Sequence, residues 1–412
     1  MKNSKEDRSL FLRVISHIRA MFYIFIDEVK NIFKDRGVVI LVILAVLVYP
    51  LLYCTLYINE TLVDVPVAVV DASHTPKSAE FARHLDATRD VQVTEKMATM
   101  QEAEQAFKEG EVHGIIYIPA DFDKKLNKGE QAVVSVYSDM SSFLYYRAMV
   151  LSTNYVALDM GEEIQVSRLN AIGITGEQQA MVSDPIPYES VILYNEGMGF
   201  ASFLMPAILI LIIHQTLFFG IGMAAGTARE ENRFHELVSS SVHRGGTFRV
   251  ILGKALAFFT LYLLWSVYLL GFIPWLFNLP HIGSPFTLLE FVIPFLLASI
   301  FFSMTISVFV PNRESQMVLL LFFSLILLFL SGISWPQSNI NIFWKAFSWL
   351  FPATFGIQAY FKINTMGAGI HEVGFEQIGL WILTAVYFVS TLLVYHWQIK
   401  KSIVKNKKEL DL

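Results

Sequence analysis

The sequence has little cysteine and little charge: one cysteine, and 16% charged residues in a chain of 412. Cys54 lies inside a long apolar run, which excludes a disulfide framework and a thiolate metal cluster. Hydrophobic residues make up 54% of the chain and aromatic residues 14%, more than soluble globular proteins carry. The composition therefore predicts a protein that crosses a membrane several times.

Signatures of the common enzyme classes are also missing. Six residues separate Gly246 from the Gly-Lys pair at 253–254, where a phosphate loop has four, and Ala255 replaces the Ser or Thr that follows the lysine. His235 lacks the second histidine of a zinc-protease helix. We therefore expect no catalytic residue, no cofactor and no metal site in this chain.

Six apolar runs are long enough to span a membrane as helices, for which about 20 residues are needed. They are residues 37–58, 199–223, 255–277, 288–310, 317–333 and 378–397. The fifth run is short and ends in the Ser-Gly-Ile-Ser-Trp-Pro sequence at 331–336, where a helix is expected to kink or stop.

Basic residues indicate the orientation of these spans, because Lys and Arg are retained on the cytoplasmic side. Eight precede the first span, five follow the last, and four lie between spans two and three. Both termini are thus expected inside and residues 59–194 outside, where positions 59–190 carry 10 basic and 21 acidic side chains. The expected location is a bacterial cytoplasmic (inner) membrane.

The pattern of residues 59–194 predicts a small extracytoplasmic α/β domain. Residues 65–71 form an apolar strand run, Thr75 precedes a proline at a helix start, and Asp121 is expected to cap a short helix. Strands and helices alternate as βαβαβαβ, and a long helix follows at about 142–169. The predicted fold class is a polytopic α-helical membrane protein, with six transmembrane helices and this inserted α/β domain.

The other predicted parts follow from the same division of the chain. An N-terminal amphipathic interfacial helix is expected in 1–36, the first span at 37–58, and a basic tail at 399–412. Spans two to six lie in 195–398. That region includes a cytoplasmic loop at 227–253 and an outward re-entrant region at 336–377. In the N-terminal helix, apolar residues recur every three or four positions. It is either a passive anchor at the membrane surface or also a contact for a partner.

Ionisable residues inside spans are costly and often functional. Only His214 lies deep in a predicted span, where it either faces a translocation path or hydrogen-bonds between helices, the commoner case. Glu290 and Lys254 lie at span ends and could reach lipid headgroups by snorkelling. Without an intramembrane carboxylate, an ion-coupled carrier is not favoured, so the energy for transport is expected from outside the chain.

The loop between spans two and three resembles that of the permease subunits of ABC-2 type exporters. The resemblance rests on Arg-Glu-Glu at 229–231, Leu237, the Ser-rich run 239–244 and Leu-Gly-Lys at 252–254. The Ser-Gly…Pro end of span five and the Phe-Pro-Ala-Thr-Phe sequence at 351–355 are similar to the same family. At Asn232-Arg233, where the family usually has Gly-Thr, the sequence departs from this pattern.

The resemblance implies a separate ATP-binding subunit, a second permease copy or paralogue, and outward transport of a hydrophobic or amphipathic substrate by alternating access. An extracytoplasmic adaptor is a further possible partner, and no nucleic acid is expected. The residues that would dock on the ATPase are those of the loop, and His214 is the pathway candidate. The docking residues are Arg229, Glu230, Glu231, Arg233, Phe234, Glu236 and Leu237.

Alternatives from other classes stay open at this point. The loop residues also fit a solvated helix end near headgroups, and the outer domain fits a rigid cap as well as a receptor for substrate. An ion-coupled secondary transporter would depend on His214 or Glu290. A membrane-anchored scaffold or receptor would act through its outer domain, although six spans exceed what an anchor needs.

Overall fold

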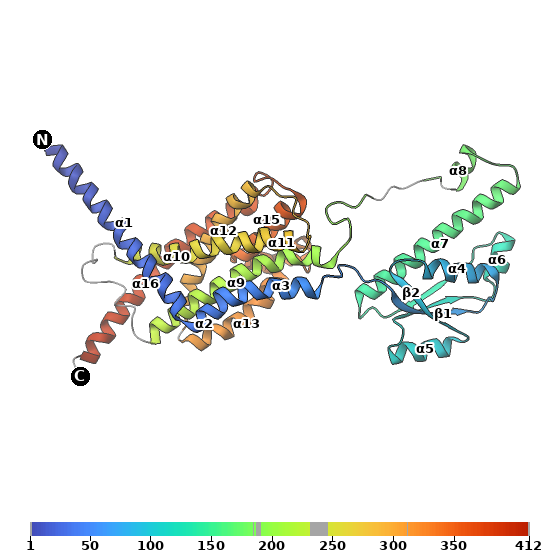
Figure 1. Cartoon of the computed structure of the whole chain (residues 1–412), viewed down its shortest axis with the longest axis horizontal. Helices are drawn as coiled ribbons and strands as arrows, with labels where there is room; N and C mark the ends of the chain where they lie inside the picture. The colour runs from blue at the N-terminus through green and yellow to red at the C-terminus, as the bar shows by residue number, and fades with distance from the viewer. Residues whose placement is uncertain (1, 184, 187–190, 231–245, 311, 411–412) are drawn as a thin grey trace. The chain divides into compact units, whose positions relative to one another are not determined.

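The structure is a computed structural model that describes residues 2–183, 185–186, 191–230, 246–310 and 312–410. The chain forms two compact units (Figure 1). One unit comprises Met1–Glu60 together with Leu193–Leu412, and the other comprises Thr61–Ile192.

Helices are the only regular secondary structure among the described residues of the first unit. Its α-helices are α1 (Lys2–Lys34), α2 (Arg36–Val39), α3 (Val46–Leu56), α9 (Phe200–Glu230), α10 (Gly246–Val267), α11 (Ile273–Leu276), α12 (Pro285–Ser307), α13 (Arg313–Leu330), α14 (Ile342–Ser348), α15 (Pro352–Met366) and α16 (Gly374–Leu410). Two π-helical stretches, η1 (Ile40–Ala45) and η3 (Tyr268–Phe272), join α2 to α3 and α10 to α11, so each of these groups continues as one rod.

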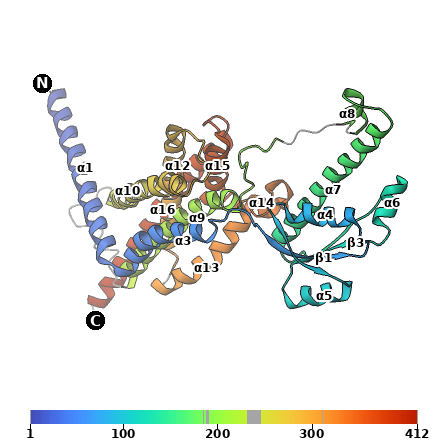
Figure 2. The ribbon, with the colours of Figure 1, turned by 45° about the vertical axis from the view of Figure 1, so that its right-hand side comes forward.

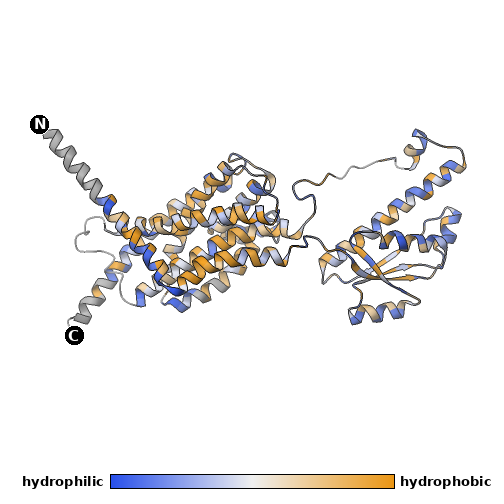
Figure 3. Ribbon diagram, viewed as in Figure 1, coloured by the Kyte–Doolittle hydropathy of each residue, from blue (hydrophilic) through white to orange (hydrophobic). Residues whose placement is uncertain are grey.

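Five helical segments are long and apolar enough to cross a membrane among the residues described. They are Arg36–Leu56, Phe200–Glu230, Gly246–Leu276, Pro285–Ser307 and Gly374–Lys401. Each overlaps one of the predicted spans, and Figure 3 shows their apolar character along the first unit. The predicted fifth span falls on α13, which is 18 residues long and ends at Leu330 just before Gly332 with its positive φ of 89°. That helix is not among the five, so a sixth span stays a prediction.

Helix α9 is the centre of the first unit. It packs against α3, α12, α13 and α15, and most of its side chains are buried. Glycines let its neighbours approach closely: a Cβ on Gly220 would lie 2.4 Å from Val42 Cγ2, and a Cβ on Gly222 would lie 2.2 Å from Gln316 Cδ. Small residues commonly bring membrane helices together in this way. α9 is therefore fixed by contacts on several sides.

Helix α1 packs along α10, and the two lie side by side in both ribbon views (Figures 1 and 2). Gly253 permits the contact, since its Cβ would lie 2.8 Å from Ile24 Cβ. On another face of α1, Ile18 and Phe22 are exposed, at 57% and 55%. The predicted amphipathic helix is thus present, with part of its apolar surface used against the bundle.

The second unit combines a four-stranded sheet with helices. Its elements are β1 (Val65–Asp71), α4 (Pro76–Asp86), β2 (Val91–Met97), α5 (Met100–Glu109), β3 (Gly114–Ile118), α6 (Phe122–Lys128), β4 (Ser135–Ser138), α7 (Phe143–Ala171) and α8 (Glu177–Ser183). The strand order is β2-β1-β3-β4, with β1 parallel to β2 and β3, and β4 antiparallel to β3. Alternation of strands and helices follows the predicted order.

Local sequence signals account for most of these boundaries. Thr75 accepts a hydrogen bond from the Ser78 backbone N–H, which caps α4 at its Pro76 start. Asp121 occupies the predicted N-cap position of α6, but its side chain makes no capping hydrogen bond and instead pairs with Lys125 at 2.8 Å. The hydrogen bond to Lys125 lowers the pKa of Asp121, because it favours the ionised carboxylate.

Candidate functional site

The loop predicted to receive force from a partner begins at the end of α9. The structure describes its first two candidate residues, Arg229 and Glu230. The other five candidates, Glu231, Arg233, Phe234, Glu236 and Leu237, lie outside the described residues. The arrangement around the end of α9 is therefore where the predicted site can be built.

Arg229 binds the end of α12. Its guanidinium donates hydrogen bonds from Nη1 to the carbonyl oxygen of Val310 and from Nη2 to that of Val308. Val308 is the C-cap of α12 and Val310 lies two residues beyond it. The carboxyl end of a helix carries partial negative charge, so a cation is favoured there. Arg229 thus ties α9 to the carboxyl end of α12.

Glu230 binds the beginning of α13. Its Oε1 accepts a hydrogen bond of 2.9 Å from the backbone N–H of Arg313, the first residue of that helix. Asn312 caps the same helix by accepting from the Ser315 N–H at 3.1 Å. The first N–H groups of a helix lack partners and attract negative charge. Two consecutive residues of α9 therefore hold both ends of the α12–α13 loop.

Arg313 extends this arrangement to the start of the first predicted span. Its Nη2 lies 2.6 Å from Oδ1 of Asp35, with side-chain exposures of 33% and 18%. Asp35 also caps α2 by accepting from the N–H groups of Gly37 and Val38. Its second oxygen, Oδ2, accepts a longer hydrogen bond of 3.4 Å from Thr227 of α9.

We call Asp35, Thr227, Arg229, Glu230 and Arg313 the charged junction. It joins the α1–α2 break, the end of α9 and the α12–α13 loop. Both of the predicted docking residues that the structure describes, Arg229 and Glu230, already bind groups within the chain. Their docking on an ATPase stays a prediction, and the structure adds a connection that the sequence did not reveal.

His214, the pathway candidate, lies between two helices. It is 1% exposed, and its Nδ1 is 3.1 Å from Ser299 Oγ on α12. Its ring also lies 5.5 Å from that of Phe302. His214 thus makes a hydrogen bond between two helices, and a place for it in the translocation pathway stays a prediction. Within the residues that the structure describes, no three His, Cys, Asp or Glu side chains are grouped so that they could hold a metal.

A comparison with protein families identifies the chain as a whole. The family described as ABC-2 family transporter protein matches residues 36–393, which is most of the sequence. The chain belongs to the ABC-2 transporter family. It is accordingly a multi-pass membrane permease of an ABC exporter, the transport component and not itself a catalyst. A comparison with curated proteins finds no match.

ABC-2 permeases normally work with an ATP-binding subunit. The charged junction lies directly before the loop after α9, which is the segment predicted to bind such a subunit. Sequence reasoning missed the parts of this junction outside the loop. Neither Asp35, just before the first span, nor Arg313, in the loop between spans four and five, was a candidate site residue from the sequence. The available signal was weak: each is a charged residue at the edge of an apolar run, a position that headgroup contact also explains.

Proposed function

We propose that this ABC-2 permease moves a hydrophobic or amphipathic substrate outward by alternating access, driven by ATP hydrolysis on a separate subunit. The observation that carries the proposal is the pair of contacts made by Arg229 and Glu230 to the two ends of the α12–α13 loop. Arg229 and Glu230, which directly precede the segment, connect α9 to the residues after α12 and to the start of α13. Displacement of the segment would then move α9, α12 and α13 together.

Docking of the ATPase is proposed for the part of the loop beyond Glu230. Phe234 and Leu237 would fill a groove on the ATPase, while Glu231, Arg233 and Glu236 would form charge pairs at its rim. Arg229 and Glu230 would connect that docking surface to the spans. Closure of two ATP-binding subunits would push the loop and change the access of the pathway between the spans.

The proposed arrangement in the cell follows the distribution of basic residues. Both termini and the loop after α9 would face the cytoplasm, and residues 59–194 would lie outside a bacterial inner membrane. Two permeases, identical or paralogous, would form the pathway. The outer unit would receive substrate, contact an adaptor, or cover the exit.

The decisive experiment is purification of the full chain together with any phosphate-loop protein encoded beside it. We expect the two to co-purify and to hydrolyse ATP. Leu237→Asp should reduce the recovered ATPase by about tenfold, since burying an unpaired charge in an apolar groove is strongly unfavourable. Met181→Asp serves as the matched control, because Met181 in α8 is 69% exposed and remote in sequence from the loop.

The proposal is contradicted if the chain purifies with normal transport and no ATPase. Equal loss of the ATPase from the Leu237 and Met181 variants would instead place the docking surface elsewhere. Variants of His214 and Glu290 distinguish an ATP-driven exporter from an ion-coupled carrier. Neutralising either residue should leave ATP-driven transport in place, whereas an ion-coupled carrier would lose transport without any ATPase present.

A further inference from the structure

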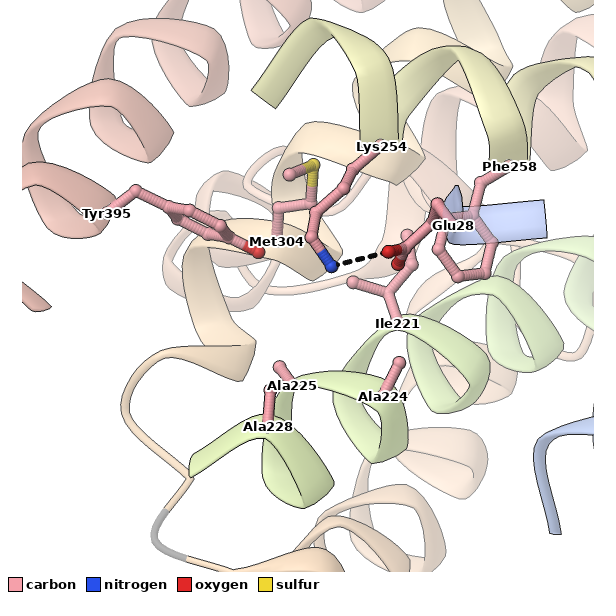
Figure 4. A pocket seen from close by; sticks show the side chains of 9 residues that line it. All are labelled: Glu28, Ile221, Ala224, Ala225, Ala228, Lys254, Phe258, Met304 and Tyr395. Atoms are coloured by element: carbon pink, nitrogen blue, oxygen red, sulfur yellow. Dashed lines mark hydrogen bonds and ion pairs between the residues drawn. The ribbon is translucent and has the colours of Figure 1, made fainter. Parts of the chain in front are cut away.

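A buried ion pair joins α1 to α10. Lys254 Nζ lies 2.7 Å from Glu28 Oε2, and their side chains are only 12% and 6% exposed. The sequence left open that Lys254 snorkels toward headgroups; in the structure its ammonium instead points toward Glu28 (Figure 4). The contact also gives α1 a charged attachment that its apolar pattern did not predict.

Five helices meet around this pair. It lines a cavity of about 10 Å³, close to the space that one water molecule needs. Ala224, Ala225 and Ala228 of α9 form one wall, and Met304 of α12 and Tyr395 of α16 form others (Figure 4). The surroundings are therefore largely apolar, and both charges have lost most of their hydration.

Stability alone is a poor explanation for such a pair. Burial of two charges costs free energy that their attraction often fails to recover, and apolar pairs of similar volume are frequently as stable. Elsewhere in the α1–α10 contact, Ile24 meets Gly253 without any charge. A slip of α1 by one turn, about 5.4 Å, would separate Glu28 from Lys254, and also His17 from Arg249, whose Nε2 and Nη2 lie 3.3 Å apart at an exposed part of the contact. The pair thus distinguishes one register from its neighbours.

Position along the chain connects this register to the loop after α9. Asp35 lies seven residues, about two helical turns, after Glu28 and binds Thr227 and Arg313 of the charged junction. Thr227 lies in the last turn of α9, and Lys254 lies in the first half of α10, on the other side of the segment that joins the two helices. The end of α1 and the residue that follows it therefore hold both sides of the segment that joins α9 to α10.

We propose that the Glu28–Lys254 pair is a positioning lock that sets the register of α1 on α10. Through this register, α1 holds the end of α9 and the first half of α10 in a fixed relation. Movement of the loop is then shared by α9, α10 and α1 instead of being absorbed by sliding of α1. This inference rests on the proposed function for its link to ATP hydrolysis, but the register itself does not depend on any partner.

Cysteine cross-linking measures the register in the full chain. In a Cys54→Ser background, Ile24→Cys with Gly253→Cys places two Cβ atoms that are 2.8 Å apart, and a shift of about 1 Å allows a disulfide. We expect rapid cross-linking with Glu28 and Lys254 present. The double variant Glu28→Leu with Lys254→Met should fold but cross-link at least about threefold less, because neighbouring registers become populated.

Two further variants separate a lock from a simple packing role. The exchange Glu28→Lys with Lys254→Glu should restore cross-linking, since the pair is re-formed with its charges reversed. Lys77→Gln, which removes an exposed 2.7 Å pair with Glu80 in α4, should leave cross-linking unchanged. If the Leu–Met variant cross-links as strongly as the unmodified pair, the lock is refuted.

The link to ATP hydrolysis is tested on the complex with its ATPase. The Leu–Met variant should still bind the ATPase, but the rate of ATP hydrolysis in the complex should fall by at least about threefold. The variant with exchanged charges should recover that rate. Unchanged hydrolysis would overturn the coupling role. Absence of any ATPase from the unmodified chain would contradict the proposed function and this coupling role with it, while cross-linking alone would still decide the register.

Discussion

At the residue scale, charges beside the apolar spans are used to complete the ends of helices. Arg229 reaches the carbonyl of the residue that caps the carboxyl end of α12 and one in the turn that follows it. Glu230 reaches the first N–H of α13, and Asp35 caps α2. Each contact satisfies backbone groups that a helix leaves without partners. Sequence reasoning identified Arg229 and Glu230 as important, but it assigned them an external partner because it had no view of these helix ends.

Substitutions of Asp35 test whether its side chain stabilises the chain both by capping α2 and by pairing with Arg313. Asp35→Asn keeps an oxygen that can cap α2 but loses the ion pair with Arg313, whereas Asp35→Ala loses both. We expect the melting temperature to fall in the order unmodified chain, Asn variant, Ala variant, with the lost cap costing about 1 kcal/mol. Thermal unfolding followed through the seven tryptophans measures the order.

Asp121→Asn is the control for that series. Asp121 and Lys125 form a pair whose side chains are 47% and 37% exposed, so its loss should change the melting temperature little. A loss equal to that of Asp35→Asn would show that the charged junction contributes no more than an exposed pair. Equal melting temperatures for the Asn and Ala variants would show that Asp35 does not act as a cap.

At the scale of elements, the apolar runs predicted the positions of the spans but not their neighbours. Five predicted spans overlap helices of sufficient length and apolarity among the described residues. Their contacts depend on where small residues allow close approach, and α9 carries three such glycines at 220, 222 and 226. Sequence periodicity could not assign these contacts, because α9 is apolar around its whole circumference.

Gly226 provides the corresponding prediction for the packing of α9. A Cβ there would lie 3.0 Å from both the backbone nitrogen and the Cα of Arg313, atoms that cannot move without moving α13. Gly226→Ala should therefore destabilise the chain by about 1–3 kcal/mol through overpacking. We expect a lower melting temperature and reduced ATP hydrolysis in the complex.

The same substitution in α7 should have the opposite sign. A Cβ on Gly161 would meet nothing within 4 Å, so Gly161→Ala should stabilise α7 by about 0.5–1 kcal/mol. Thermal unfolding of the two variants side by side gives the comparison. A Gly226 variant as stable as the unmodified chain would show that α13 adjusts without cost.

At the scale of the whole molecule, each unit has its own buried core. The helical unit is built around α9, and the second unit packs apolar residues on both faces of its sheet. In the strand order β2-β1-β3-β4, the three parallel strands are adjacent, with β2 at one edge of the sheet and the antiparallel β4 at the other. The membrane side on which the second unit lies stays a prediction from the basic residues.

Labelling with a membrane-impermeant maleimide in intact cells tests that orientation. In a Cys54→Ser background, Lys128→Cys in the second unit should be labelled, and Lys401→Cys near the end of α16 should be labelled only after the membrane is opened. Both lysines are exposed, so access to the thiol is not limited by packing. The reverse pattern would invert the topology and place the loop after α9 outside.

The sequence by itself determined the membrane character, five of the spans, the alternation of strands and helices in residues 61–192, and the resemblance that the family match confirmed. Apolar length, turn residues and local caps are properties of neighbouring residues, so they can be read along the chain. Only the tertiary structure decided the partners of Glu28, Asp35, Arg229 and Lys254. Those partners lie between about 80 and 280 positions away in the sequence. A buried charge needs a partner, and the packing of the helices determines which group lies close enough to be that partner.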